Sequence, residues 1–86
     1  MTNKLNPAPE HGRVAIAAPV VKRLLKEART IAALSSAASA ELGWMCDERT
    51  VRLAIDRLRR GTKTEAQVPI NRVAPNTFKI EARRAV

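Results

Sequence analysis

The most restrictive feature of this sequence is the stretch 47–61, whose apolar residues recur at helical spacing. Three- and four-residue steps separate its apolar side chains, Val51, Ala54, Ile55 and Leu58. This spacing places them along one side of an α-helix. Asp47 suits the N-cap position, and Gly61 is a typical residue at which a helix ends. The stretch is therefore predicted to be an amphipathic helix with one buried side.

The opposite side of this helix is charged. Arg49, Leu53, Asp56 and Arg60 project from it, and Arg52 and Arg57 flank it. Of the net charge of +8, residues 1–48 supply +1 and residues 49–86 supply +7. The positive charge is thus concentrated on the predicted helix and the chain after it, which favours a polyanionic partner such as nucleic acid. Eleven arginines against five lysines support this, because arginine binds phosphate and guanine through two hydrogen bonds.

Other classes of function find little support in the sequence. Cys46 is the only cysteine and His11 the only histidine, so neither a disulfide nor a zinc site nor a hydrolytic triad can be assembled. We therefore expect no enzymatic activity, no metal and no cofactor. No apolar run has the length of a membrane span or a signal peptide, so a cytoplasmic protein without a membrane partner is expected.

The chain before residue 47 predicts a tail and two helices. Residues 1–13 contain two prolines and a glycine without periodicity and are expected to be a flexible tail. Val14–Ala18 is either a strand or the start of a helix. Pro19 is then expected in the first turn of a helix over residues 19–34. A shorter helix is predicted over 34–43, capped by Ser35 or Ser36 and ended by Gly43.

After Gly61 the pattern changes from helical to β. Residues 66–73 and 77–82 alternate apolar and polar side chains and flank Ala74-Pro75-Asn76. Pro75 and Asn76 suit the central positions of a type I turn. Pro69 lacks a backbone donor, so its strand is expected at the edge of a sheet. The segment 66–82 is therefore predicted to be a β-hairpin.

Two helices joined by a short turn form a helix-turn-helix. The run LSSAASAELGWMCDERTVRLAIDRLRRG resembles the helix-turn-helix of winged-helix DNA-binding proteins, a family that includes many bacterial and phage regulators. The resemblance implies a mainly α fold with a small β-hairpin, a winged helix-turn-helix domain over residues 14–82 in which three helices are followed by a two-stranded wing. It also implies that helix 47–60 enters the major groove. Residues 83–86, which include Arg83 and Arg84, are expected to be a basic tail. Trp44 and Met45 lengthen the turn, which departs from the tightest members of the family.

On this interpretation the contacts to bases come from the first half of the helix, and the contacts to the DNA backbone surround it. The predicted base contacts are Arg49, Thr50, Arg52, Leu53 and Asp56. The predicted backbone contacts are Ser35, Ser36, Arg57, Arg59, Arg60, Lys63, Arg72 and Asn76. Asp56 either accepts a hydrogen bond from cytosine or orients Arg52 and Arg60, and we favour the orienting role.

The residues of the turn are expected to serve the core. Trp44 is predicted to cover the core rather than stack on a base, and Met45 and Cys46 are predicted to pack under the turn. The leading hypothesis is a sequence-specific regulator of transcription that binds double-stranded DNA as a homodimer at a bacterial nucleoid. The alternative is a protein-interaction module that uses the same scaffold to bind an acidic protein. RNA binding is disfavoured, because the chain has one Trp, one Phe and no Tyr for base stacking.

Overall fold

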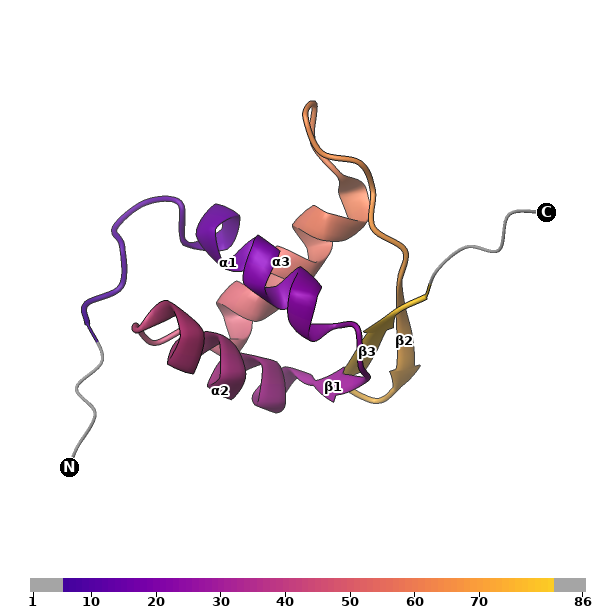
Figure 1. Ribbon diagram of the computed structural model, residues 1–86, viewed down its shortest axis with the longest axis horizontal. Coiled ribbons are helices and arrows are strands. Elements are labelled where there is room, and N and C mark those ends of the chain that lie inside the picture. The colour runs from indigo at the N-terminus through magenta and orange to yellow at the C-terminus, as the bar shows by residue number, and fades with distance from the viewer. Residues whose placement is uncertain (1–5, 82–86) are drawn as a thin grey trace.

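The computed structural model describes residues 6–81, which form three helices and a three-stranded antiparallel sheet (Figure 1). In chain order the elements are α1 (Arg13–Leu24), β1 (Arg29–Thr30), α2 (Ile31–Leu42), α3 (Glu48–Arg60), β2 (Ile70–Ala74) and β3 (Thr77–Ile80). The strands lie in the order β1-β3-β2. The fold is therefore mixed α/β, and the predicted two-stranded wing is corrected to a three-stranded sheet.

Helix α3 confirms the prediction for residues 47–61. The Asp47 carboxylate accepts a hydrogen bond from the Thr50 N–H at 2.8 Å, which caps the first turn. Gly61 follows the last residue of the helix with a positive φ. The four apolar residues of the predicted stripe are all buried: Val51, Ala54, Ile55 and Leu58. The signals at both ends of the helix and the burial of its apolar stripe therefore agree with the prediction.

The prediction for the first helix, over residues 19–34, is wrong. Helix α1 begins at Arg13 and ends at Leu24, so Val14–Ala18 is helical and Pro19 lies inside the helix. A proline there removes one backbone hydrogen bond, at a cost of about 3 kcal/mol. Ala17 and Ala18 just before it are almost completely buried in the core. Their packing keeps the chain helical on the N-terminal side of the proline.

Strand β1 lies within the helix that the sequence predicted over residues 19–34. Arg29 is paired with Phe78 and Thr30 with Thr77 in an antiparallel ladder. The apolar spacing that suggested a continuous helix includes Ala28, which is exposed. Pairing with a strand almost fifty residues later therefore interrupts the helix, and this contact is not visible in a local pattern.

Helix α2 begins earlier than predicted and ends as predicted. The Thr30 hydroxyl accepts a hydrogen bond from the Ala33 N–H at 3.1 Å and caps the helix. Ser35 and Ser36 therefore lie inside α2, and neither serves as its N-cap. Gly43 ends the helix with a φ of 76°, in the left-handed region that glycine adopts without strain.

The turn between α2 and α3 is held by two serines of α2. The Ser39 hydroxyl accepts a hydrogen bond from the Cys46 N–H at 2.8 Å, and the Ser35 hydroxyl donates to the Cys46 carbonyl at 2.6 Å. Trp44 and Cys46 are buried in the core, which confirms their predicted packing roles. The prediction for Met45 is wrong, because its side chain is 61% exposed. Cys46 is fixed to α2 and Trp44 is turned inward, so Met45, which lies between them, faces solvent.

The β-hairpin is confirmed, with shorter strands than the sequence predicted. Strand β2 begins at Ile70 and not at residue 66, and it is an edge strand, as expected from Pro69 just before it. Pro75 and Asn76 form the turn. Asn76 has a φ of 54°, which excludes the predicted type I turn, because the second central residue of that turn has a negative φ.

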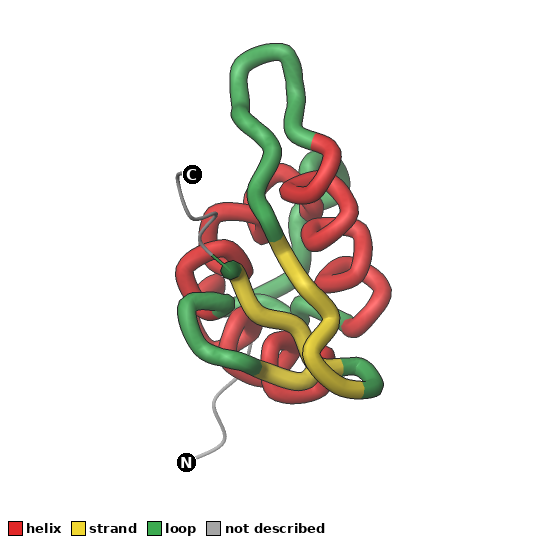
Figure 2. Tube along the Cα trace, turned by 90° about the vertical axis from the view of Figure 1, so that its right-hand side faces the viewer, coloured by secondary structure: helices red, strands yellow, loops and turns green. Residues whose placement is uncertain are grey.

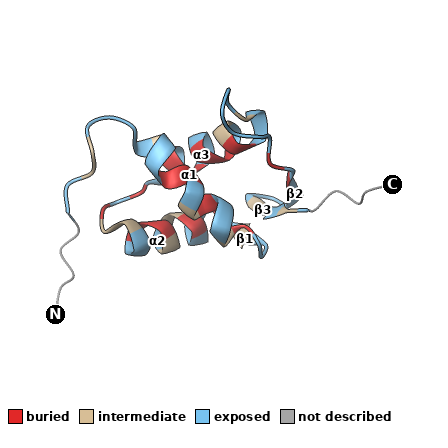
Figure 3. Cartoon of the chain, turned by 45° about the horizontal axis from the view of Figure 1, so that its top comes forward, coloured by how far each residue is buried: buried red, intermediate tan, exposed pale blue. Residues whose placement is uncertain are grey.

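The three helices turn their buried faces toward one another, and the sheet covers one end of this core (Figures 1 and 3). Phe78 and Ile80 of β3 are half-buried against it. Residues 61–69, between α3 and β2, form a loop that extends away from the helices (Figure 2).

Ahead of α1, the Asn6 N–H donates to the Gly43 carbonyl at 2.7 Å. The predicted basic tail, 83–86, lies outside the described residues. None of the helices in residues 6–81 has the length and apolar character needed to cross a bilayer.

Candidate nucleic-acid interface

The outer side of α3 presents most of the side chains predicted to contact bases. Arg49, Arg52, Asp56 and Arg60 are exposed, and Leu53 has 41% of its surface accessible. They share this side because the apolar stripe of the same helix faces α1 and α2, which leaves the charged stripe in solvent (Figure 3). The interface is therefore a positively charged ridge along one helix. We call these five residues the α3 ridge.

Thr50 does not belong to this surface. Thr50 lies on the side of α3 that faces the core, and only 7% of its surface is accessible. Its backbone N–H is already bound to the cap residue Asp47. We therefore leave Thr50 out of the candidate base contacts and assign it to the packing of the first turn.

Arg57 and Arg59 have partners within the protein, whereas the sequence placed both on DNA phosphates. The Arg57 guanidinium pairs with the Glu65 carboxylate at 3.1 Å, which connects α3 to the loop 61–69. Arg59 donates from Nε to the Ile70 carbonyl at 3.2 Å. Its guanidinium carbon also lies 6.0 Å from the centre of the Phe78 ring, within the range of a cation–π contact. These two arginines therefore join the helix to the segments that follow it.

Asp56 is not in the orienting arrangement favoured from the sequence. No ion pair within 4.0 Å connects its carboxylate to Arg52 or Arg60 in the described structure. Asp56 and Arg52 instead border a hollow of about 250 Å³ between α3 and the sheet, together with Arg59 and Phe78. The carboxylate thus remains exposed beside the arginines and is free to accept a hydrogen bond from a ligand.

The remaining predicted backbone contacts are dispersed around α3. Ser36 on α2 and Lys63 in the loop 61–69 are exposed, whereas the Ser35 hydroxyl is bound to the turn. Arg72 is exposed on β2 opposite Phe78, three residues before Pro75 of the hairpin turn and not at its tip. The Asn76 carbonyl accepts a hydrogen bond from the Ile31 N–H at 2.8 Å. The hairpin turn is therefore attached to the first residue of α2.

One cation near the start of the ridge was not predicted from the sequence. Arg13, which was assigned to a flexible tail, is the first residue of α1, and its Nε donates to the Pro9 carbonyl at 2.6 Å. Its charge is close enough to act on the carboxylate of Asp47. No local signal identified this position, because the proximity arises from the packing of α1 against α3.

The cap residue Asp47 gives a pH-dependent prediction. Hydrogen bonding to the Thr50 side chain and backbone lowers the pKa of Asp47, and the charges of Arg13 and Arg49 lower it further. Because the folded-state pKa is below the unfolded value, the cap stabilises the protein fully above the unfolded pKa. Its contribution is lost as the pH falls through the folded pKa. We expect Asp47→Ala to reduce the free energy of unfolding by about 1 kcal/mol at neutral pH.

The measurement is urea unfolding followed through the fluorescence of Trp44, at pH 7 and at pH values below 4. The difference between wild type and Asp47→Ala should shrink in acid. Glu48→Ala is the matched control, because Glu48 is an exposed acid in the same turn that is not the N-cap. A difference that stays constant with pH would contradict the assignment of Asp47 as a charged cap.

The described residues contain no group of three or more His, Cys, Asp or Glu side chains that could hold a metal ion. Cys46 is buried, and this burial, followed by the charge of Asp47, raises the pKa of its thiol. No protein-family model, curated protein or solved structure matches this chain.

Proposed function

We propose that this protein binds double-stranded DNA in a sequence-specific manner, with α3 in the major groove, and acts as a regulator of transcription. The observation that carries the proposal is the state of three arginines on the α3 ridge. Arg49, Arg52 and Arg60 are exposed, and none of them forms an ion pair or a hydrogen bond with another described residue. Three guanidinium groups on the outer side of one helix are available to guanine edges and phosphates.

The arrangement of the other elements supports a winged-helix interpretation. Helices α2 and α3 are joined by a short turn, and a β-hairpin follows α3, as in a helix-turn-helix with a wing. In this geometry the first half of α3 would face base edges, so we assign base contacts to Arg49, Arg52, Leu53 and Asp56. Contacts to phosphates are assigned to the exposed residues around them, Ser36, Arg60, Lys63 and Arg72.

Salt dependence provides the direct test. We expect the purified protein to bind duplex DNA with an affinity that falls steeply as salt rises, because each neutralised phosphate releases counterions. About five phosphate contacts would give a slope of about −4 to −5 in log affinity against log salt concentration. Fluorescence anisotropy of a labelled duplex, titrated at several salt concentrations, measures this slope. Affinity that does not change with salt would exclude the proposed DNA-binding function.

A selection of bound sequences from a random DNA pool would then define the preferred site. We propose a homodimer on a two-fold site, because a single small domain buries limited surface on DNA. Palindromic enriched sequences would support this arrangement, and single half-sites would contradict it. In a bacterial host this function would place the protein at the nucleoid in the cytoplasm.

A further inference from the structure

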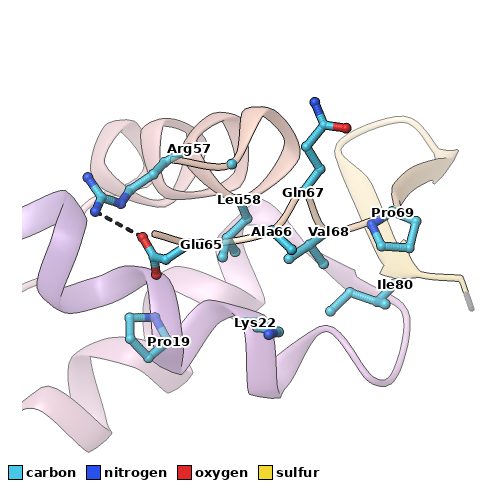
Figure 4. A pocket seen from close by; sticks show the side chains of 11 residues that line it. Pro19, Lys22, Arg57, Leu58, Glu65, Ala66, Gln67, Val68, Pro69 and Ile80 are labelled. Atoms are coloured by element: carbon cyan, nitrogen blue, oxygen red, sulfur yellow. Dashed lines mark hydrogen bonds and ion pairs between the residues drawn. The ribbon is translucent and has the colours of Figure 1, made fainter. Parts of the chain in front are cut away.

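A second surface, separate from the α3 ridge, is a groove between α1 and the chain that follows α3. It consists of two adjoining hollows of about 530 and 420 Å³, which share Pro19, Lys22 and Ile80. Figure 4 shows the residues that line the larger hollow. None of the arginines of the α3 ridge lines either hollow. The groove is therefore available to a ligand while α3 is occupied.

The lining of the groove is largely apolar. Leu58 from the end of α3, Val68 and Pro69 from the chain before β2, and Ile80 from β3 line it opposite Pro19 of α1. Apolar side chains of a partner that entered this space would be removed from water, which is favourable in proportion to the area buried. A hollow of this kind at the junction of several elements is typical of a binding site.

The rim of the groove is positively charged. Lys22 and Lys26 line it, and neither forms an ion pair with another described residue. The other charged groups on the rim are already compensated, since Arg23 pairs with Glu41 and Arg57 pairs with Glu65. Two ammonium groups therefore remain beside an apolar floor.

We propose that this groove binds a short acidic segment of a partner protein. Apolar side chains of the segment would occupy the floor, and its carboxylates would pair with Lys22 and Lys26. Charge complementarity selects this occupant over a second copy of the chain, because the protein carries a net charge of +8 and two copies would repel each other at a basic rim. Nucleic acid is disfavoured here by the apolar lining and by the small number of cations.

The test begins with peptides selected from a random display library against the full chain in the absence of DNA. We expect the selected peptides to combine Asp or Glu with apolar residues. One of them, made synthetically, is then titrated against wild type, Lys22→Glu and Lys79→Glu. Lys79 on β3 is the matched control, because it is exposed, carries the same charge and does not line the groove.

We expect Lys22→Glu to weaken peptide binding by about tenfold, as for the loss of a charge-assisted contact, and Lys79→Glu by less than about twofold. NMR signals of Lys22, Val68 and Ile80 should shift on titration, and those of Arg49 and Arg52 should not. Equal weakening by both variants, or selection of neutral or basic peptides, would overturn the proposal. So would groove signals that change with protein concentration alone, which would indicate a second copy. Binding that strengthens on removal of residues 82–86 would likewise show that the chain itself is the occupant.

Discussion

Gly61→Ala is expected to lower the free energy of unfolding by about 3 kcal/mol, the largest effect on stability that we predict for a single methyl group. Gly61 has φ 71° and ψ 178°, a backbone conformation that is essentially restricted to glycine. A Cβ at this position would lie 2.8 Å from the Glu65 carbonyl oxygen and 3.0 Å from the Gln67 nitrogen. Both contacts are to backbone atoms, so the loop 61–69 would have to move.

Two other glycines provide matched controls for this substitution. Gly12 and Gly43 also have positive φ values, 75° and 76°. A Cβ at Gly12 would meet no atom within 4 Å, and one at Gly43 would meet only the Asn6 side chain at 3.6 Å. Alanine at either position should cost about 1 kcal/mol, the ordinary penalty of a left-handed residue. Urea unfolding followed by Trp44 fluorescence compares the three variants, and equal costs would show that the loop does not close over Gly61.

The largest functional effect is expected from Arg49→Ala and Arg52→Ala. Each should reduce the preference for the selected DNA site over random DNA by about 1–3 kcal/mol, because a guanidinium that forms two hydrogen bonds to guanine is lost. Helix content should not change, since both side chains are exposed and have no partner among the described residues. Competition titrations with specific and random duplexes measure the preference.

Arg72→Ala is the comparison that separates specificity from general affinity. Arg72 is exposed on β2 and does not belong to α3, so its loss should weaken specific and random DNA equally. The salt slope should decrease by about one unit. If Arg49→Ala and Arg52→Ala behaved in this same way, α3 would bind only the DNA backbone. An Arg72→Ala variant with unchanged affinity and slope would show that the hairpin lies away from DNA.

The sequence predicted α3 almost residue by residue because several independent signals coincide there. Asp47 begins the helix, Gly61 ends it, and the apolar stripe between them is unbroken. The hairpin was predicted for a similar reason, since Pro75 and Asn76 mark its turn. Elements whose boundaries are set by local chemistry are thus accessible from the sequence.

The boundary between α1 and α2 was not accessible in this way. Val21, Leu24 and Ile31 repeat at helical spacing across it, although the first two belong to α1 and Ile31 begins α2. The break is set by the pairing of Arg29 and Thr30 with β3, a contact distant in sequence. Pro19 added to the error, because a proline is more often found at the start of a helix than inside one.

The residues of the candidate site also fall into those that the local sequence could place and those that it could not. Helical spacing alone placed Arg49, Arg52 and Arg60 on the exposed side of α3, where the structure has them. The same spacing could not show that Arg57 would meet Glu65 or that Arg59 would lie over Phe78. Those partners come from the loop and the sheet, so the number of arginines free to bind a ligand depends on tertiary structure.

The buried turn residue Cys46 has a practical consequence for kinetics. It is the only thiol in the chain, its side chain is inaccessible, and its raised pKa disfavours the reactive thiolate. A thiol reagent can therefore reach it only when α2 and α3 separate. The rate of alkylation at a given reagent concentration consequently reports the opening of this junction under native conditions, without denaturant.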